Sequence, residues 1–279
     1  MEVYTEYRKA KGFDIFVKRL GSGEPIVFLH GGPGDEHRYF LPHVTPLAND
    51  FTLIFYDQRG CGQSAAPHST AFNMKDEMEA LEELRESLGM QKMNLLGQSW
   101  GTILGLFYAV HYPEHVSRLM LVSYIGLKGA DLKRFGELLA DRMTEKENEE
   151  LNNLENNTYH LTPEERQKKL TDLVFPYYLY NRENLKRITP TRINHKVNKQ
   201  ICDDILANYD VEDLLYKLDS IPVMIIQGAK DLITPDICQE TLKKVPHAKM
   251  EIFHQSGHWP FLEEPEKFIS VTKPFFNHT

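Results

Sequence analysis

Short runs of consecutive hydrophobic residues recur along the chain, and each is followed by a glycine or a polar residue. Five clear runs occupy residues 25–30, 52–57, 93–99, 117–123 and 222–228, and a weaker one occupies 249–254. Each has the length of a β-strand. Hydrophobicity that is continuous rather than alternating is typical of strands covered on both faces, as in a parallel sheet. The pattern therefore predicts a buried, mostly parallel sheet.

Helical periodicity fills the intervals between these runs. Asn73 and Asp76 form an N-cap signal ahead of hydrophobic residues spaced as on one face of a helix, and Gly89 ends that segment. A second, largely apolar helix is expected after Gly101 and should end before Pro113. Strands that alternate with helices predict an α/β fold with right-handed crossovers. Residues 3–20 alternate more loosely and predict an antiparallel hairpin at the sheet edge.

Residues 127–212 interrupt this alternation. No glycine occurs from Glu137 to Gln227, and the segment carries 16 acidic and 14 basic residues, so its charges nearly cancel. We interpret 127–212 as a helical cap inserted into a core formed by 1–126 and 213–279. The aromatic stretch 174–180 could line a pocket or form the interior of the cap.

Composition narrows the class of protein. Hydrophobic residues make up 41% of the 279 residues and charged residues 26%, as in ordinary globular proteins. A net charge of −8 and the absence of a basic run argue against nucleic acid as a partner. No hydrophobic stretch approaches the roughly 20 residues that cross a bilayer, so no membrane partner is expected.

The cysteines and the N-terminus bear on the compartment. Cys61, Cys202 and Cys238 are odd in number and widely spaced, which fits neither a disulfide framework nor a zinc site. The first residues, MEVYTEYRKAKG, lack the hydrophobic centre of a secretory signal. We therefore expect a reducing, cytoplasmic location and no metal.

The strongest chemical signal is the sequence Gly97-Gln98-Ser99-Trp100-Gly101 at the end of the run 93–99. G-x-S-x-G is common by chance and can be a simple tight turn. It is also the pattern of a nucleophile elbow, in which a serine on a strained strand-to-helix turn exposes its Oγ. The flanking glycines would then be required because a Cβ at either position would clash.

A base and an acid for this serine are expected on loops at the carboxyl ends of later strands. Asp231 follows the run 222–228, and His258 follows the run 249–254. The chain order Ser99, Asp231, His258 is that of the α/β-hydrolases. His254 is the nearest alternative base, but it belongs to the last predicted strand.

Two residues of the segment YDQRGCGQS at 56–64 are alternative candidates for chemistry. Asp57 also ends a predicted strand and could orient the base, and Cys61 could be a reactive thiol. We interpret Asp57 and Arg59 as residues that hold loops together, and Cys61 as a small buried side chain.

Backbone amides should supply the oxyanion hole. One donor is expected from Trp100, the residue after the nucleophile, and another from the glycine-rich loop HGGPGDEH at 30–37. Gly32 is our choice for this second donor, and Gly31 is its alternative.

Five segments together resemble the proline iminopeptidase family of α/β-hydrolases. They are HGGPG (30–34), YDQRGCGQS (56–64), GQSWGT (97–102), QGAKD (227–231) and SGHWPFLEEPEKF (256–268). The resemblance covers the core, about 1–126 and 213–279. It implies a Ser-His-Asp hydrolase that needs no metal or organic cofactor, has a helical cap, and removes an N-terminal residue, often proline, from short peptides.

The cap departs from this family. Its typical members have a cap rich in Trp-Glu, whose glutamate helps to bind the substrate's amino group, but residues 127–212 contain no tryptophan. Some relatives have a glutamate directly after the catalytic acid, where this chain has Leu232. The substrate-binding residues therefore stay open, as does the oligomeric state.

Three functions remain at the level of sequence. An aminopeptidase is the leading hypothesis, and a carboxylesterase or lactonase using the same triad is the second. A non-catalytic binding protein on a hydrolase scaffold is the third, but the triad residues and the oxyanion loop are all present. A serine at the elbow argues against epoxide hydrolases and dehalogenases, which need a carboxylate there.

Overall fold

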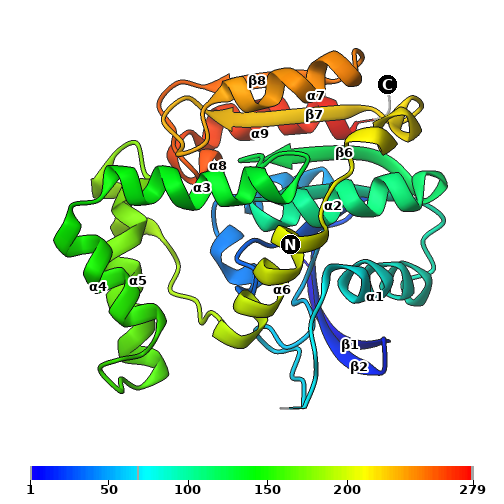
Figure 1. The fold of residues 1–279 in the computed structure, drawn as a ribbon. Coiled ribbons are helices and arrows are strands. Elements are labelled where there is room, and N and C mark those ends of the chain that lie inside the picture. Colours follow the sequence, from blue (N-terminus) through cyan, green and yellow to red (C-terminus); the bar gives the residue numbers. More distant parts are fainter. Residues whose placement is uncertain (1, 68, 278–279) are drawn as a thin grey trace.

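A computed structural model describes residues 2–67 and 69–277 and shows one large sheet flanked by helices (Figure 1). Within these residues the sheet has eight strands in the order β1-β2-β4-β3-β5-β6-β7-β8. The strands are β1 (Val3–Ala10), β2 (Phe13–Leu20), β3 (Glu24–Leu29), β4 (Phe51–Tyr56), β5 (Met93–Gln98), β6 (Val116–Val122), β7 (Val223–Gly228) and β8 (Lys249–Phe253).

The strand directions match the sequence pattern. β1 and β2 form an antiparallel hairpin at one edge, and β2 pairs antiparallel with β4. All pairings from β4 to β8 are parallel. The predicted α/β class, with a mostly parallel sheet and an edge hairpin, is confirmed.

The helices connect these strands across both faces of the sheet. They are α1 (Met74–Ser87), α2 (Trp100–His111), α3 (Gly129–Arg142), α4 (Glu145–Glu155), α5 (Pro163–Tyr178), α6 (His195–Asn208), α7 (Cys238–Lys244), α8 (Pro260–Glu263) and α9 (Pro265–Phe276). The Asn73 side chain accepts a 2.8 Å hydrogen bond from Asp76 N and caps α1, as predicted. None of the helices in the described ranges is both long and apolar enough to cross a membrane.

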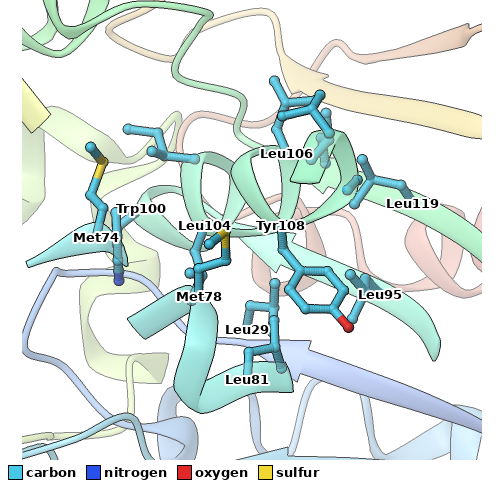
Figure 2. Packing of buried hydrophobic residues seen from close by; sticks show 14 of the residues in the cluster. Leu29, Met74, Met78, Leu81, Leu95, Trp100, Leu104, Leu106, Tyr108 and Leu119 are labelled. Atoms are coloured by element: carbon cyan, nitrogen blue, oxygen red, sulfur yellow. The ribbon is translucent and has the colours of Figure 1, made fainter. Parts of the chain in front are cut away.

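Successive side chains along a strand enter two different hydrophobic layers. Val27 and Leu29 of β3 belong to the layer beneath α1 and α2, whereas Ile26 and Phe28 belong to the layer beneath α8 and α9. Figure 2 shows part of the first layer, where Leu29 lies with Leu81 and Leu104 of the covering helices. The strands are continuously hydrophobic because both of their faces are buried.

The chain between β6 and β7 forms helices α3 to α6. α4 and α5 lie side by side and project beyond the sheet (Figure 1). α6 is different, because its buried residues Val197, Ile201 and Ile205 belong to the same hydrophobic layer as α1 and α2. These helices all fall within 127–212, whose bounds as a separate cap stay a prediction. Residues 1, 68 and 278–279 of the predicted core lie outside the described residues.

Candidate active site

Ser99 occupies a single-residue turn between a strand and a helix. β5 ends at Gln98 and α2 begins at Trp100, and Ser99 between them has φ 55° and ψ −121°. A positive φ is uncommon outside glycine and indicates strain that the surrounding structure must hold. The Ser99 N–H donates to Val122 O at 3.0 Å, and Ser99 O accepts from Thr102 N at 2.7 Å. Ser99 itself is partly exposed. This is the geometry expected of a nucleophile elbow.

The two glycines beside Ser99 allow backbone segments to approach closely. A Cβ on Gly97 would lie 2.1 Å from Gly101 O, and a Cβ on Gly101 would lie 2.1 Å from Leu29 O. Both distances are far below van der Waals contact with backbone atoms, which cannot move without displacing β3 or α2. The elbow sequence therefore needs glycine at both positions, as the sequence analysis predicted.

Replacement of Gly101 with alanine should lower the free energy of unfolding by about 1–3 kcal/mol or more, because the new methyl group overlaps Leu29 O. The matched control is Gly136→Ala in α3, where an added Cβ has no atom within 4 Å. That variant should instead gain about 0.5–1 kcal/mol from the better helix propensity of alanine. Urea unfolding of both variants measures the difference. A Gly101→Ala protein as stable as wild type would contradict the close approach at the elbow.

Asp231 and His258 are joined directly. His258 Nδ1 lies 3.0 Å from Asp231 Oδ2 and 3.1 Å from Oδ1, and both side chains are almost completely buried. The Asp231 carboxylate also accepts from Leu232 N at 2.6 Å and from Gln227 Nε2 at 3.3 Å. Because Asp231 engages Nδ1, Nε2 is the ring nitrogen left for another partner.

The backbone of His258 is fixed from three sides. Its N–H donates to Tyr178 O at 2.7 Å, while its carbonyl oxygen accepts from Gln98 Nε2 at 3.1 Å and from Ser123 Oγ at 2.8 Å. Gln98 is the residue directly before Ser99, so this contact ties the His258 loop to the elbow. The Ser99 hydroxyl makes no hydrogen bond to any described residue. The structure thus joins Asp231 to His258 directly and ties the His258 loop to the residue before Ser99 through Gln98.

Aromatic residues of the inserted segment cover the His258 ring. The ring centroids of Tyr178 and Phe135 lie 5.2 Å and 5.3 Å from that of His258. Burial raises the pKa of Tyr178 above its ordinary value, and the charge of Asp231 adds to this effect. The stretch 174–180 therefore contributes to the surroundings of the site and is not only the interior of the insertion.

Hydrogen bonding distinguishes Gly31 from Gly32, the two alternatives for the donor on the predicted oxyanion loop. The Gly31 N–H already donates to the Tyr39 hydroxyl at 2.6 Å, and Gly31 is buried. Gly32 is exposed, and neither its N–H nor that of Trp100 donates a hydrogen bond to another described residue. Trp100 is the first residue of α2, where the helix supplies no acceptor for the amide. Of the two glycines, only Gly32 therefore has a backbone amide without an acceptor among the described residues, and the Trp100 amide is equally without one.

The segment 56–64 holds loops together. The Asp57 carboxylate accepts from His37 Nδ1 at 2.7 Å and from Gln63 N at 2.9 Å. Arg59 Nε donates to Glu77 at 2.8 Å. Cys61 is buried, and burial raises its thiol pKa well above the ordinary value. These observations match the structural interpretation of Asp57, Arg59 and Cys61.

One alternative base and one cluster of possible metal ligands remain to be placed. His254 lies one residue beyond β8 and is exposed, so its expected place inside the strand is wrong by one position. Glu36, His37 and Asp57 lie close enough to share a cation. Their groups are already used by the protein, however, because Glu36 pairs with Arg38 and His37 with Asp57.

A family model and individual relatives both assign the chain to the α/β-hydrolases. The α/β-hydrolase fold family matches residues 24–265. The chain is 31% identical to the proline iminopeptidase of Lactobacillus delbrueckii subsp. lactis, over 96% of each chain. It belongs to the proline iminopeptidase family of α/β-hydrolases. The protein is therefore a serine hydrolase.

Solved structures share the fold of this proline iminopeptidase family member. The proline iminopeptidase of Mycobacterium smegmatis superposes with a TM-score of 0.73 at 22% identity, over 98% of this chain and 97% of the other. An esterase from Exiguobacterium antarcticum gives a TM-score of 0.71 at 21% identity, over 96% and 98%. Because enzymes named for different substrates share this architecture, the fold alone does not select the substrate.

Several residues that contact His258 could not be predicted from the sequence. Gln98 was visible only as the variable residue of G-x-S-x-G, and Ser123 only as the end of a hydrophobic run. Tyr178 lies 80 residues before His258. Their contacts with His258 join segments distant in sequence, and nothing in the local sequence of any of them signals the contact. The positions at the carboxyl ends of β5 and β6 were the only available clue.

Proposed function

We propose that this enzyme is an aminopeptidase that releases proline or another small N-terminal residue from short peptides, with Ser99, His258 and Asp231 as its triad. The observation that carries the mechanism is the buried hydrogen bond between Asp231 and His258 Nδ1, on a loop tied through Gln98 to the Ser99 elbow. The substrate class is supported by the relatives named proline iminopeptidase, which match nearly the whole chain.

The first half of the reaction forms an acyl-enzyme. His258 Nε2 takes the proton of the Ser99 hydroxyl as Oγ attacks the carbonyl carbon of the N-terminal residue. Asp231 holds the imidazole in the tautomer with hydrogen on Nδ1 and stabilises the imidazolium that forms. The tetrahedral intermediate then breaks its C–N bond, and His258 gives the proton to the leaving amine.

The second half regenerates the enzyme. His258 takes a proton from a water molecule, which attacks the acyl carbon, and the Ser99 oxygen leaves with that proton. The released product is the free N-terminal amino acid. Each step uses only side chains, backbone amides and water.

Oxyanion stabilisation is assigned to the backbone amides of Gly32 and Trp100. Both N–H groups are without an acceptor among the described residues, so they can donate to the oxygen that becomes negative in the tetrahedral intermediate. The loss of one such donor typically costs about 3–4 kcal/mol of transition-state stabilisation.

The inserted segment is proposed to limit substrate length. Tyr178 O accepts a hydrogen bond from the His258 N–H, and the rings of Tyr178 and Phe135 lie against the imidazole. A substrate must therefore bind beside these aromatic side chains, beneath α3 and α5. Short peptides fit this arrangement better than a long chain that would have to pass under the insertion.

Free-amine substrates should be hydrolysed faster than blocked ones. We expect prolyl or alanyl arylamides to exceed their N-acetylated forms in kcat/KM by about tenfold or more, because a charge-assisted hydrogen bond to the ammonium group is worth about 1.5–3 kcal/mol. A chromogenic panel with free-amine arylamides, the N-acetylated arylamides and short acyl esters measures this.

The same panel separates the alternatives. N-acetylated arylamides cleaved as fast as free ones, with short esters fastest of all, would leave the triad in place but make the enzyme an esterase. No turnover of any substrate, together with no labelling by a serine-directed phosphonate, would favour a non-catalytic protein.

A further inference from the structure

Asp35 differs from the other buried carboxylates of the protein. Among the described residues, five acidic side chains are buried, and four of them contact a basic side chain. The four pairs are Glu36 with Arg38, Asp57 with His37, Glu77 with Arg59, and Asp231 with His258. Asp35 has no such partner in the described ranges, although it is only 9% exposed. A buried carboxylate without a cation is costly unless something supplies one.

The immediate surroundings compensate the charge of Asp35 only weakly. Arg38 is close enough to be influenced by Asp35, but its guanidinium is hydrogen-bonded to Glu36. The Asp35 carboxylate accepts a hydrogen bond from Glu36 N at 2.8 Å and another from the Thr191 hydroxyl. The nearby charges of Glu36 and Asp57 are negative. Burial is the largest cause that raises the pKa of Asp35, and the charges of Glu36 and Asp57 raise it further. The two hydrogen bonds act in the opposite direction, yet the pKa is still about 7. A cation beside Asp35 would lower this pKa and favour the ionised carboxylate.

Asp35 lies on the oxyanion loop. A Cβ on Gly31 would lie 3.2 Å from Ser99 Cβ, whereas a Cβ on Gly32 would lie 3.3 Å from Asp35 Cβ. Two successive glycines of one loop therefore approach the nucleophile and Asp35. Gly32 itself is exposed.

The inserted segment closes over the same loop. Asn194 N donates to Gly34 O at 2.8 Å, and Asn198 Nδ2 donates to Pro33 O at 3.0 Å. With the Thr191 hydroxyl on Asp35, these contacts place residues 191–198 against the loop that carries both the oxyanion donor and the unpaired carboxylate. Asp35 thus lies where the chain leading into α6 packs against the oxyanion loop.

We propose that Asp35 binds the ammonium group of the substrate and thereby determines the preference for a free N-terminus. The inference rests on the proposed aminopeptidase function. In such a substrate the ammonium nitrogen is two bonds from the scissile carbonyl carbon. A carbonyl oxygen held by Gly32 N consequently brings the ammonium group within a few ångströms of that glycine, which Asp35 adjoins.

Electrostatics at the oxyanion hole supports this role. An ionised Asp35 without a cation would repel the negative oxygen that forms beside Gly32. A bound ammonium group removes that repulsion, so the substrate that brings its own cation gains most in the transition state. The inserted segment offers no equivalent, because none of the Asp or Glu residues of 127–212, a segment described throughout, is buried.

The test is Asp35→Asn in the full-length enzyme, assayed with prolyl arylamide, its N-acetylated form and a short acyl ester. Asparagine keeps the shape and the oxygen acceptor while removing the charge. We expect the ratio of kcat/KM for the free amine over the N-acetylated form to fall by about tenfold or more. The N-acetylated substrate and the ester should keep or gain rate. Asp35→Ser gives the same measurement if the asparagine variant folds poorly.

Glu36→Gln is the matched control, because it removes the neighbouring buried charge, which Arg38 already neutralises. It should keep the preference for the free amine, because the Asp35 carboxylate stays in place, whatever it does to thermal stability. A wild-type preference for free amines that persists in Asp35→Asn and Asp35→Ser would overturn the role of Asp35 and leave the aminopeptidase function intact. An equal loss on all three substrates would show a structural role and overturn it as well. Wild-type enzyme without that preference would instead overturn the proposed function itself.

Discussion

Replacement of Ser99 with alanine should reduce kcat by about 10⁵–10⁶-fold and abolish labelling by a serine-directed phosphonate. The reason is that Ser99 is proposed to form the acyl-enzyme, and no other described group occupies the strained turn between β5 and α2. The melting temperature should change little, because the Ser99 hydroxyl makes no hydrogen bond within the described residues. Single-turnover assays and mass spectrometry of the labelled protein measure the two effects.

Two controls make this result specific. Ser270→Ala removes an exposed hydroxyl from α9 and should keep full turnover and labelling. The double variant Ser99→Ala/His258→Ala should be scarcely slower than either single variant, since the members of a triad act as one unit. Turnover that survives in Ser99→Ala would refute the mechanism. Losses that multiply in the double variant would show that Ser99 and His258 act independently.

Asp231→Asn should lower kcat by about 10⁴-fold while the protein stays folded. An asparagine amide facing His258 Nδ1 donates a hydrogen bond instead of accepting one. The proton then resides on Nε2, so the imidazole cannot take the proton of Ser99. Steady-state kinetics with the preferred arylamide, together with a thermal melt, measures the change.

Asp236→Asn is the matched control for this prediction, because Asp236 is an exposed carboxylate a few residues along the same loop. It should keep wild-type kcat. If Asp231→Asn also retained wild-type kcat with an intact melt, the orienting role of Asp231 would be wrong, and a different acid would have to hold His258.

The sheet was predictable because the sequence records which strands are covered on both faces. Val27 and Leu29 pack on one side of β3 and Ile26 and Phe28 on the other, so every position from 26 to 29 must be hydrophobic. The start of α1 was predictable for a local reason, since the Asn73 side chain accepts from the N–H of Asp76, only three residues along the chain.

The candidate triad was also accessible from sequence. Ser99 was recognisable because it is flanked by the glycines that a close backbone approach requires. Asp231 and His258 were recognisable because they follow the ends of β7 and β8. Parallel strands bring their carboxyl ends to one edge, so position along the chain translates into position in space.

Sequence could not show which parts of the insertion leave the core. α3 to α6 are all rich in polar residues, yet α6 buries Val197, Ile201 and Ile205 in the main hydrophobic layer while α4 and α5 pair with each other. Amphipathic helices of similar composition are distinguished only by the surface that receives their hydrophobic face.

What the sequence determined by itself is the set of local requirements: continuous hydrophobic strands, a capped helix, glycines around Ser99, and an acid and a histidine in the right order. Only the tertiary structure decided which distant groups meet. It placed the rings of Tyr178 and Phe135 against His258 and paired the Gly31 N–H with the Tyr39 hydroxyl. It also left Asp35 buried without an ion-pair partner among the described residues. Pairing and burial of a side chain depend on segments far away in the chain, so no local pattern can encode them.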